Sequence, residues 1–132
     1  KILGEVKTNN KHNFFIWTIE KYLLKTEEMM KSMGYKVHAR IVWNKVTGMD
    51  TAFTVRYQHE YLLWCYKKGN ILMPVKKEQG KWTDVFTEQV RRHSQKPEHA
   101  YEMIEAMFPE AEKIELFARK TRNGWDCWGN EV

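Results

Sequence analysis

The stretch that decides the fold is the C-terminal third, Arg91–Val132, which reads RRHSQKPEHAYEMIEAMFPEAEKIELFARKTRNGWDCWGNEV. Pro97 suits the first turn of a helix, because its fixed φ and missing N–H cost nothing there, and Pro109 ends that helix. The next run, Ile114–Ala118, is short and apolar at its centre, which predicts a central strand. A helix that leads into a strand whose carboxyl end opens onto a crevice is typical of nucleotide-like cofactor sites in α/β proteins.

The predicted helix is amphipathic. Glu98 lies in its first turn, where the helix macrodipole favours a negative charge. The apolar side chains expected to cover the core are Tyr101, Ile104 and Phe108 on one face, with Ala100, Met103 and Met107 beside them.

A polar turn and a second short strand follow the central strand. Lys120–Gly124 is polar and rich in turn-forming residues. Trp125–Trp128 is predicted to be a strand, with Asn130 and Glu131 at its end. This order places hydrogen-bonding groups where a ribose could bind.

The N-terminal part of the chain supplies more strands and another helix. Asn13–Thr18 is predicted to be a buried strand, and Glu20–Met33 is the clearest helix, which Gly34 ends. Val37–Lys45 is predicted to be a strand with one wetter face, and Glu60–Lys68 is expected to pair with it as an antiparallel edge. The residues expected to share the apolar face are Val37, Ala39, Ile41 and Trp43.

Composition limits the class of protein. A length of 132 residues fits one domain, and 22 basic against 17 acidic residues give a formal net charge of +5, which permits a nucleic-acid partner. Cys65 and Cys127 lie far apart without a C-x-x-C pattern, which predicts a reduced, cytoplasmic protein without a metal site. No stretch approaches the roughly 20 apolar residues of a membrane span.

Two segments of the C-terminal third carry a resemblance to a known family. SQKPEHAYEMIE at 94–105 and IELFARKTRNGWDCWGNEV at 114–132 resemble the C-terminal signature of the N6-adenine methyltransferases named for the seventy-kilodalton subunit of the mRNA enzyme. The resemblance to the bacterial and phage DNA methyltransferases of this family is close. Weaker similarity extends through Phe14–Thr18, Ile41–Lys45 and His59–Leu63, in the family's order.

The resemblance implies a Rossmann-like, S-adenosylmethionine-dependent methyltransferase fold of class α/β, in permuted order. One domain would cover 1–132, with the cofactor-binding part at about 94–132. The family holds the adenine amine with an Asp-Pro-Pro-Trp motif, whereas the only prolines here are at 74, 97 and 109. In sequence, that motif and its strand would precede Lys1. In the sheet, the strand would lie between those at 114–118 and 13–18. The sheet is therefore expected to be incomplete, and an N-terminal catalytic segment or a second chain, in a homodimer or heterodimer, is expected to complete it.

The resemblance also assigns roles to single residues. Those implied to bind the cofactor are Lys96, Phe117, Arg119, Arg122, Asn130 and Glu131, and those implied to bind the substrate are Glu60, Arg91 and Arg92. The residues that could meet phosphates are Arg91, Arg92, Lys76 and Lys77. The aromatic residues that could stack on a flipped base, or else lie in the core, are Trp17, Trp43 and Trp64.

Each assignment has a plainer alternative, such as a solvated basic turn, a core aromatic or a polar strand end.

Two function classes remain open. One is an N6-adenine methyltransferase that acts on DNA rather than RNA. The other is a catalytically inactive, methyltransferase-like subunit that binds nucleic acid or scaffolds an active partner.

Overall fold

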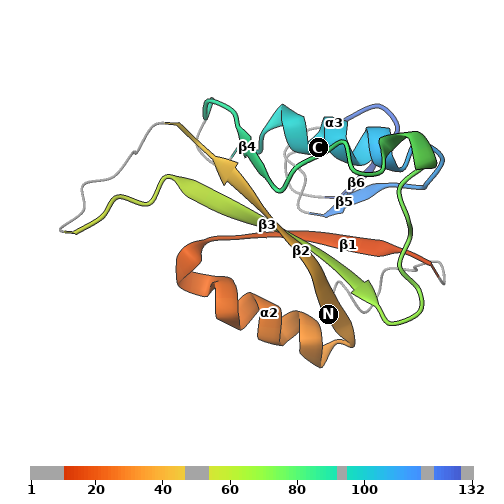
Figure 1. The fold of residues 1–132 in the computed structure, drawn as a ribbon, viewed down its shortest axis with the longest axis horizontal. Coiled ribbons are helices and arrows are strands. Elements are labelled where there is room, and N and C mark those ends of the chain that lie inside the picture. Colours follow the sequence, from red (N-terminus) through yellow and green to blue (C-terminus); the bar gives the residue numbers. More distant parts are fainter. Residues whose placement is uncertain (1–10, 47–53, 92–94, 117–120, 129–132) are drawn as a thin grey trace.

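The computed structural model describes residues 11–46, 54–91, 95–116 and 121–128. Strands and helices alternate along it, as predicted for a mixed α/β fold (Figure 1). The elements are β1 (Asn13–Thr18), η1 (Glu20–Tyr22), α2 (Leu23–Ser32), β2 (Tyr35–Asn44), β3 (His59–Lys67), η2 (Lys76–Glu78), β4 (Val85–Thr87), α3 (Glu98–Met107), β5 (Ile114–Leu116) and β6 (Asp126–Trp128).

Four strands form the main sheet, in the order β1-β3-β2-β4. β3 runs antiparallel to both β1 and β2, whereas β4 runs parallel to β2. The predicted pairing of β2 with β3 is confirmed, but they do not form an edge, because β1 and β4 flank them. Since β1, β2 and β4 point the same way, Thr18, Asn44 and Thr87 end their strands at one border, which we call the carboxyl edge.

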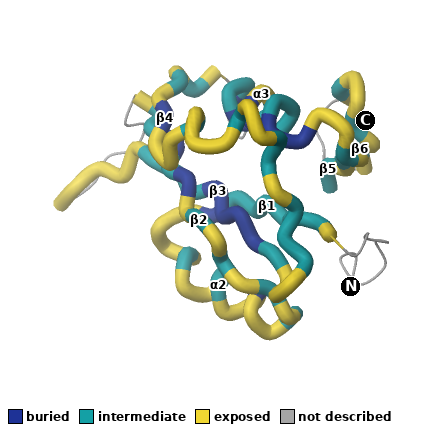
Figure 2. The backbone as a smooth tube through the Cα atoms, turned by 45° about the vertical axis from the view of Figure 1, so that its right-hand side comes forward, coloured by how far each residue is buried: buried dark blue, intermediate teal, exposed yellow. Residues whose placement is uncertain are grey.

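The two faces of the main sheet are covered by different helices. α2 lies on one face and α3 on the other (Figure 1). Alternate side chains of β3 point to opposite faces of the sheet. Leu62 and Trp64 pack with Met103 of α3. Leu63 and Cys65 pack with Met30 of α2. The deepest burial accordingly follows β2, β3 and the inner side of α3 (Figure 2).

A β-bulge in β2 changes which face its side chains occupy. The pairing register with β3 shifts between Val37 and Ala39. Val37 therefore packs in the α2 cluster, whereas Ala39, Ile41 and Trp43 pack in the α3 cluster. The prediction that Val37 shares their face is wrong, because the extra residue in a bulge shifts the alternation of side chains by one.

The helix α3 buries part of the predicted apolar surface. Ala100, Met103 and Met107 are its buried residues, and Tyr101 is only half-buried. The Tyr101 hydroxyl donates to Glu115 Oε2 of β5 at 2.7 Å. The helix contacts two neighbours, so the small and flexible stripe faces the main sheet while Tyr101 faces the β5–β6 pair.

β5 and β6 form a separate two-stranded parallel sheet next to α3. Strands are confirmed at 114–116 and 126–128, and the remainder of the predicted strand 114–118 lies outside the described residues. Within the described part of the chain, the two sheets do not pair with each other, and β1 pairs only with β3.

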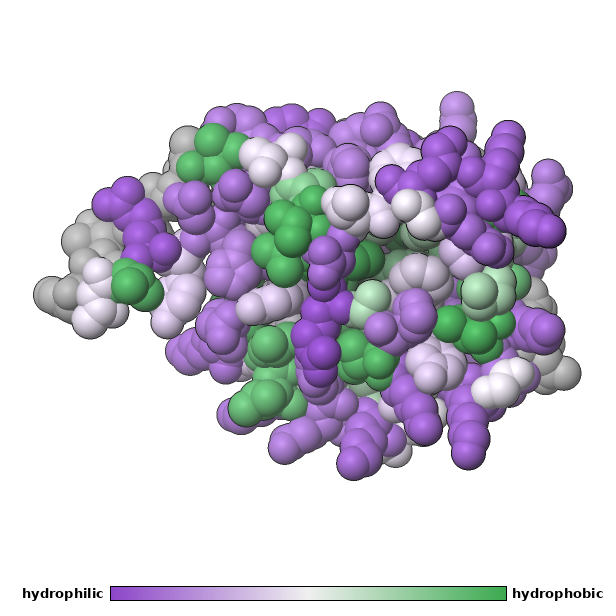
Figure 3. Space-filling model, viewed as in Figure 1, coloured by the Kyte–Doolittle hydropathy of each residue, from purple (hydrophilic) through white to green (hydrophobic). Residues whose placement is uncertain are grey.

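The described surface is largely polar. Hydrophilic side chains cover most of the face in Figure 3, and apolar ones appear as small separate patches. Both helices have ten residues, and the described residues contain no helix of the length and apolarity that crossing a membrane requires.

Candidate functional site

An open pocket of about 400 Å³ lies at the carboxyl edge, where β1 ends and β3 begins. Ligands of open α/β sheets bind outside the carboxyl ends of the parallel strands. The lining residues are Trp17, Thr18, Ile19, Tyr22, Thr26, Glu60 and Lys96. We call this the edge pocket.

Glu60 is the electrostatic centre of the edge pocket. Lys96 Nζ donates to Glu60 Oε1 at 2.9 Å, and Lys45 Nζ donates to Oε2 at 3.0 Å. Burial alone would raise the pKa of Glu60, but the two ammonium groups outweigh it and hold the pKa below its ordinary value. Glu60 is therefore an ionised acceptor whose two oxygens are each bound to a lysine.

Each lysine also lies over an indole ring. Lys96 Nζ is 5.1 Å from the centroid of Trp17, which borders the edge pocket. Lys45 Nζ is 5.5 Å from Trp43, a core residue. Carboxylate and ring together fix each ammonium more tightly than either would alone. Lys96 thus presents an oriented positive charge at the pocket wall.

The segment that carries Lys96 is anchored by Glu88, just after β4. The Glu88 carboxylate accepts the backbone N–H groups of Glu98, at 2.8 Å, and His99, at 2.9 Å, in the first turn of α3. The Glu88 carbonyl accepts Trp43 Nε1 at 2.9 Å. This one residue ties β4, the core and the start of α3 together, because a carboxylate satisfies N–H groups that lack helical partners.

A second polar cluster joins α3 to the β5–β6 pair. Arg122 donates to Glu98 at 2.6 Å and to Glu105 through two nitrogens, and its guanidinium lies 4.7 Å from the ring centroid of Tyr101. Trp125 Nε1 also donates to Glu105, at 2.7 Å. Hydrogen bonding to Arg122, despite some burial, holds the pKa of Glu105 below its ordinary value. All three guanidinium nitrogens therefore bind carboxylates of the protein itself.

The structure brings together only some of the site residues predicted from the sequence. Glu60 and Lys96 meet in the edge pocket, and Arg91 lies nearby, where it donates to the Lys96 carbonyl at 3.0 Å. Arg122 lies apart, in the cluster on α3. The predicted residues outside the described part of the chain are Arg92, Phe117, Arg119, Asn130 and Glu131.

The aromatic candidates also separate. Trp43 and Trp64 are buried in the core, whereas Trp17 is half-buried and borders the edge pocket. The sequence interpretation missed Lys45 and the hydroxyl pair of Thr18 and Thr26, whose oxygens are 2.8 Å apart. It also missed Glu88, because a cap ten residues before the helix leaves no local signal in the sequence.

Neither cysteine is in a disulfide: Cys65 is buried and Cys127 half-buried. Burial raises the pKa of the Cys65 thiol to about 11, so that thiol is protonated at neutral pH. Among the described residues, no group of three or more histidine, cysteine or acidic side chains is placed to hold a metal ion.

The chain is similar to known methyltransferases over nearly all of its length. It is 34% identical over 121 residues to the Type II methyltransferase M.MunI of a Mycoplasma species, a match that covers 89% of this chain and 49% of that protein. It is 30% identical over 127 residues to the human N(6)-adenosine-methyltransferase catalytic subunit METTL3, covering 89% of this chain and 21% of that protein. A similar protein of Arabidopsis thaliana, N(6)-adenosine-methyltransferase MT-A70-like, is 29% identical over 124 residues, covering 89% of this chain and 18% of that protein.

The chain thus spans about half the length of the first of these relatives and about a fifth of the other two. A family model, MT-A70, matches residues 4–131, which is nearly the whole chain. The chain therefore belongs to the MT-A70 family of methyltransferases.

Proposed function

We propose that the chain is part of an S-adenosylmethionine-dependent N6-adenine methyltransferase that acts on DNA. The observation that carries this proposal is the edge pocket. Within a chain of the MT-A70 family, it places Glu60 and Lys96 at the carboxyl ends of three parallel strands. DNA is preferred to RNA because the Type II methyltransferase M.MunI is the relative of highest identity among those named above.

The edge pocket has the chemistry to hold part of the cofactor. S-adenosylmethionine carries a carboxylate, an ammonium group, ribose hydroxyls and a sulfonium, and when bound it supplies the methyl group. Lys96 offers a cation for the carboxylate and Glu60 an acceptor for the ammonium group, while the ring of Trp17 holds Lys96 in place. These residues fit the group, and Lys96 is the one we assign to its methionine end or to the entering substrate.

The remaining cofactor contacts are proposed to come from residues that follow β5 and β6. These two strands are parallel, so Leu116 and Trp128 end at the same side of their sheet. Phe117 and Arg119 follow the first strand directly, and Asn130 with Glu131 follow the second. Arg122 would contribute by fixing β5–β6 on α3 rather than by contact, because its nitrogens already bind glutamates.

We propose that the complete sheet is Rossmann-like, with one more strand between β1 and β5. Among the described residues, β1 pairs only with β3, and β5 and β6 form a separate pair of strands. Backbone groups along a covered strand edge need hydrogen-bond partners. An N-terminal catalytic segment, or a second chain in a homodimer or heterodimer, would supply that strand together with the Asp-Pro-Pro-aromatic motif.

The work of such an enzyme is mainly orientation. The lone pair of the adenine amine is delocalised into the ring, so acceptors must hold the amine in line with the transferred methyl group. The two lysines hold Glu60 in a fixed position, and Arg91, with 42% of its side chain exposed, would meet a phosphate of the DNA. Residues 1–132 would form one domain, and a cytoplasmic location stays a prediction.

Calorimetry with S-adenosylhomocysteine, the stable product of the cofactor, tests the cofactor role. The intact protein is expected to bind it, and Asn130→Ala with Glu131→Ala is expected to abolish binding. The exposed Glu110→Ala serves as a control that leaves binding unchanged. Incorporation of labelled methyl groups into adenine of duplex DNA then tests the reaction.

Absence of binding by a folded protein would exclude the cofactor role. The chain would then be better described as a methyltransferase-like subunit that binds nucleic acid or scaffolds an active partner. Binding without methyl transfer to DNA, but with transfer to RNA, would correct only the substrate.

A further inference from the structure

A second pocket lies on the α3 side of the main sheet, away from the carboxyl edge. It measures about 260 Å³, and its walls include three aromatic side chains, His38, Trp64 and Trp82, with Glu78 beside them. Trp64 follows Glu60 by four residues on β3, which is about 13 Å along the strand. We call it the aromatic pocket, and nothing in the proposed methyl transfer uses it.

The walls of the aromatic pocket combine flat rings with a fixed acceptor. His38 and Trp64 meet edge to face, with ring centroids 4.7 Å apart. Trp82 Nε1 donates to Glu78 Oε1 at 2.9 Å, which fixes both side chains. A pocket of this size is smaller than the roughly 300–1,000 Å³ that encloses a whole ligand. It suits one planar ring better than a complete nucleotide.

Trp64 also carries an unpaired polar group. Its indole N–H is buried and has no hydrogen-bond partner, the one such side-chain atom found among the described residues. Buried polar groups are nearly always paired, so this donor is an exception, and it belongs to a residue that lines the aromatic pocket.

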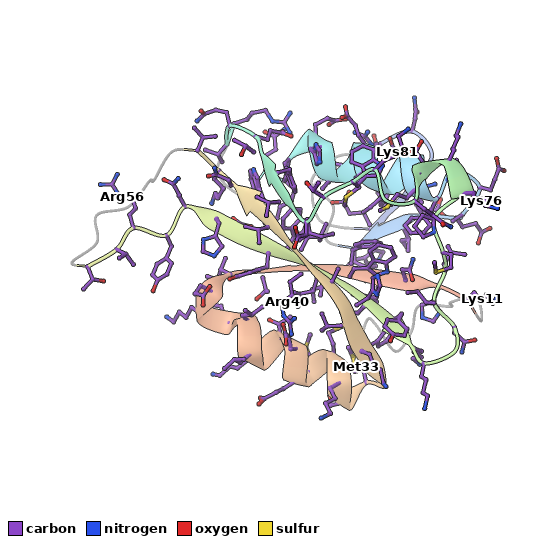
Figure 4. The ribbon with its side chains drawn as sticks, in the orientation of Figure 1. Lys11, Met33, Arg40, Arg56, Lys76 and Lys81 are labelled. Atoms are coloured by element: carbon purple, nitrogen blue, oxygen red, sulfur yellow. The ribbon has the colours of Figure 1, made fainter. Side chains whose placement is uncertain are left out.

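Three lysines are close in sequence to the residues that line the aromatic pocket. Lys76, Lys77 and Lys81 are exposed and come from the same turn as Glu78 and Trp82. Figure 4 places Lys76 and Lys81 at the end of the molecule opposite Arg56, and hydrophilic side chains crowd this region in Figure 3. Lys81 Nζ lies 3.6 Å from Glu78 of the pocket wall, and Lys76 and Lys77 are exposed residues of η2.

We propose that the aromatic pocket holds an unstacked base of single-stranded nucleic acid, with the flanking phosphates against Lys76, Lys77 and Lys81. Aromatic rings that stack bases, beside cations that follow the backbone, are how proteins bind single strands. The inference rests on the proposed function only for the class of partner. It adds a contact outside the edge pocket, which would grip the strand next to the reacting base.

Fluorescence anisotropy with a labelled single-stranded oligonucleotide of about twelve nucleotides tests the inference on the intact protein. Trp82→Ala is expected to weaken binding roughly 5- to 100-fold, as for loss of one stacked base. Trp82→Phe keeps a ring and is expected to stay within about threefold of the wild type, which separates stacking from misfolding.

The role of the lysines is tested by salt dependence. Lys76→Gln with Lys77→Gln is expected to reduce the slope of log affinity against log salt by about 1.4, at roughly 0.7 per lost phosphate contact on a single strand. The matched control is Lys25→Gln with Lys31→Gln, two exposed lysines of α2 that lose the same charge. The inference is overturned if both pairs have the same effect, or if polyglutamate competes as well as the oligonucleotide.

The two proposals fail in different ways. Variants of the aromatic pocket are expected to bind S-adenosylhomocysteine like the wild type and to reach the same methylation rate at saturating DNA. A protein that methylates DNA while its pocket variants bind the oligonucleotide normally retains the proposed function and loses this inference. A protein that binds neither cofactor nor nucleic acid loses both.

Discussion

The main sheet and the β5–β6 pair are stabilised in different ways. The main sheet is buried from both sides, by an α3 cluster around Trp43 and an α2 cluster around Met30. The β5–β6 pair has three residues in each strand, and a polar network around Arg122 fixes it to α3. Burial of apolar surface is non-directional, whereas a charge network depends on geometry. Substitutions in the polar network should therefore detach the β5–β6 pair from α3 while the main sheet stays folded.

The largest effect is expected at the centre of the main sheet. Trp43 is 1% exposed, and its indole N–H donates to the Glu88 carbonyl. Trp43→Ala should lower the free energy of unfolding by about 3–5 kcal/mol, through lost packing and a cavity. Urea denaturation measures this. Trp128→Ala, at a residue of β6 that is 48% exposed, is the control and should cost less than about 1 kcal/mol.

An intermediate effect is expected in the polar network. Arg122→Ala leaves Glu98 and Glu105 without their cation and should destabilise β5–β6 by about 1–3 kcal/mol. Hydrogen exchange should quicken at residues 114–116 and 126–128 and stay unchanged in β3. The control is Arg40→Ala, whose pair with Glu27 is also bidentate but whose side chain is 52% exposed (Figure 4). Equal loss of protection in both sheets would contradict the comparison.

The smallest effect is expected at Glu60, and it depends on pH. Because the pKa of Glu60 in the folded protein lies below its ordinary value of 4.5, its contribution is fully present above about pH 4.5. It is lost as the pH falls through the folded pKa. Glu60→Gln should cost about 1 kcal/mol at pH 7 and progressively less as the pH falls below 4.5. Thermal unfolding across this range measures the difference, with the exposed Glu112→Gln as the reference. A constant difference at all pH values would show that charge is not involved.

The same contrast explains what the sequence could predict. β1 begins and ends where the apolar run Asn13–Thr18 does, and α3 lies between its two prolines, because these signals are local. The bulge at His38 was missed, since nothing in the alternation of β2 marks where one residue is extra. Tyr101 of α3 is only half-buried because its hydroxyl bonds to β5, a second neighbour of the helix that a helical pattern does not show.

The contacts of the edge pocket were likewise predictable only in part. Glu60 and Lys96 are 36 residues apart, so their pairing could be expected only from family resemblance and not from spacing. Lys45 lies beside Glu60 because β2 and β3 are adjacent. Glu88 reaches the start of α3 from the end of β4, which pairs with β2 on the side away from β3. Both residues depend on strand order, which single-sequence patterns do not specify.

The position of β3 between β1 and β2 has a consequence for how the chain folds. β1, α2 and β2 are consecutive in sequence, yet the two strands do not touch, and β3 must enter between them from residues 59–67. Neither strand has its antiparallel ladder until β3 arrives, and closing the long stretch of chain between β1 and β3 slows folding. We expect β1 and β2 to gain protection from hydrogen exchange in the same kinetic phase, as β3 inserts. A separate, earlier phase is expected for α2, because the backbone hydrogen bonds of a helix are local.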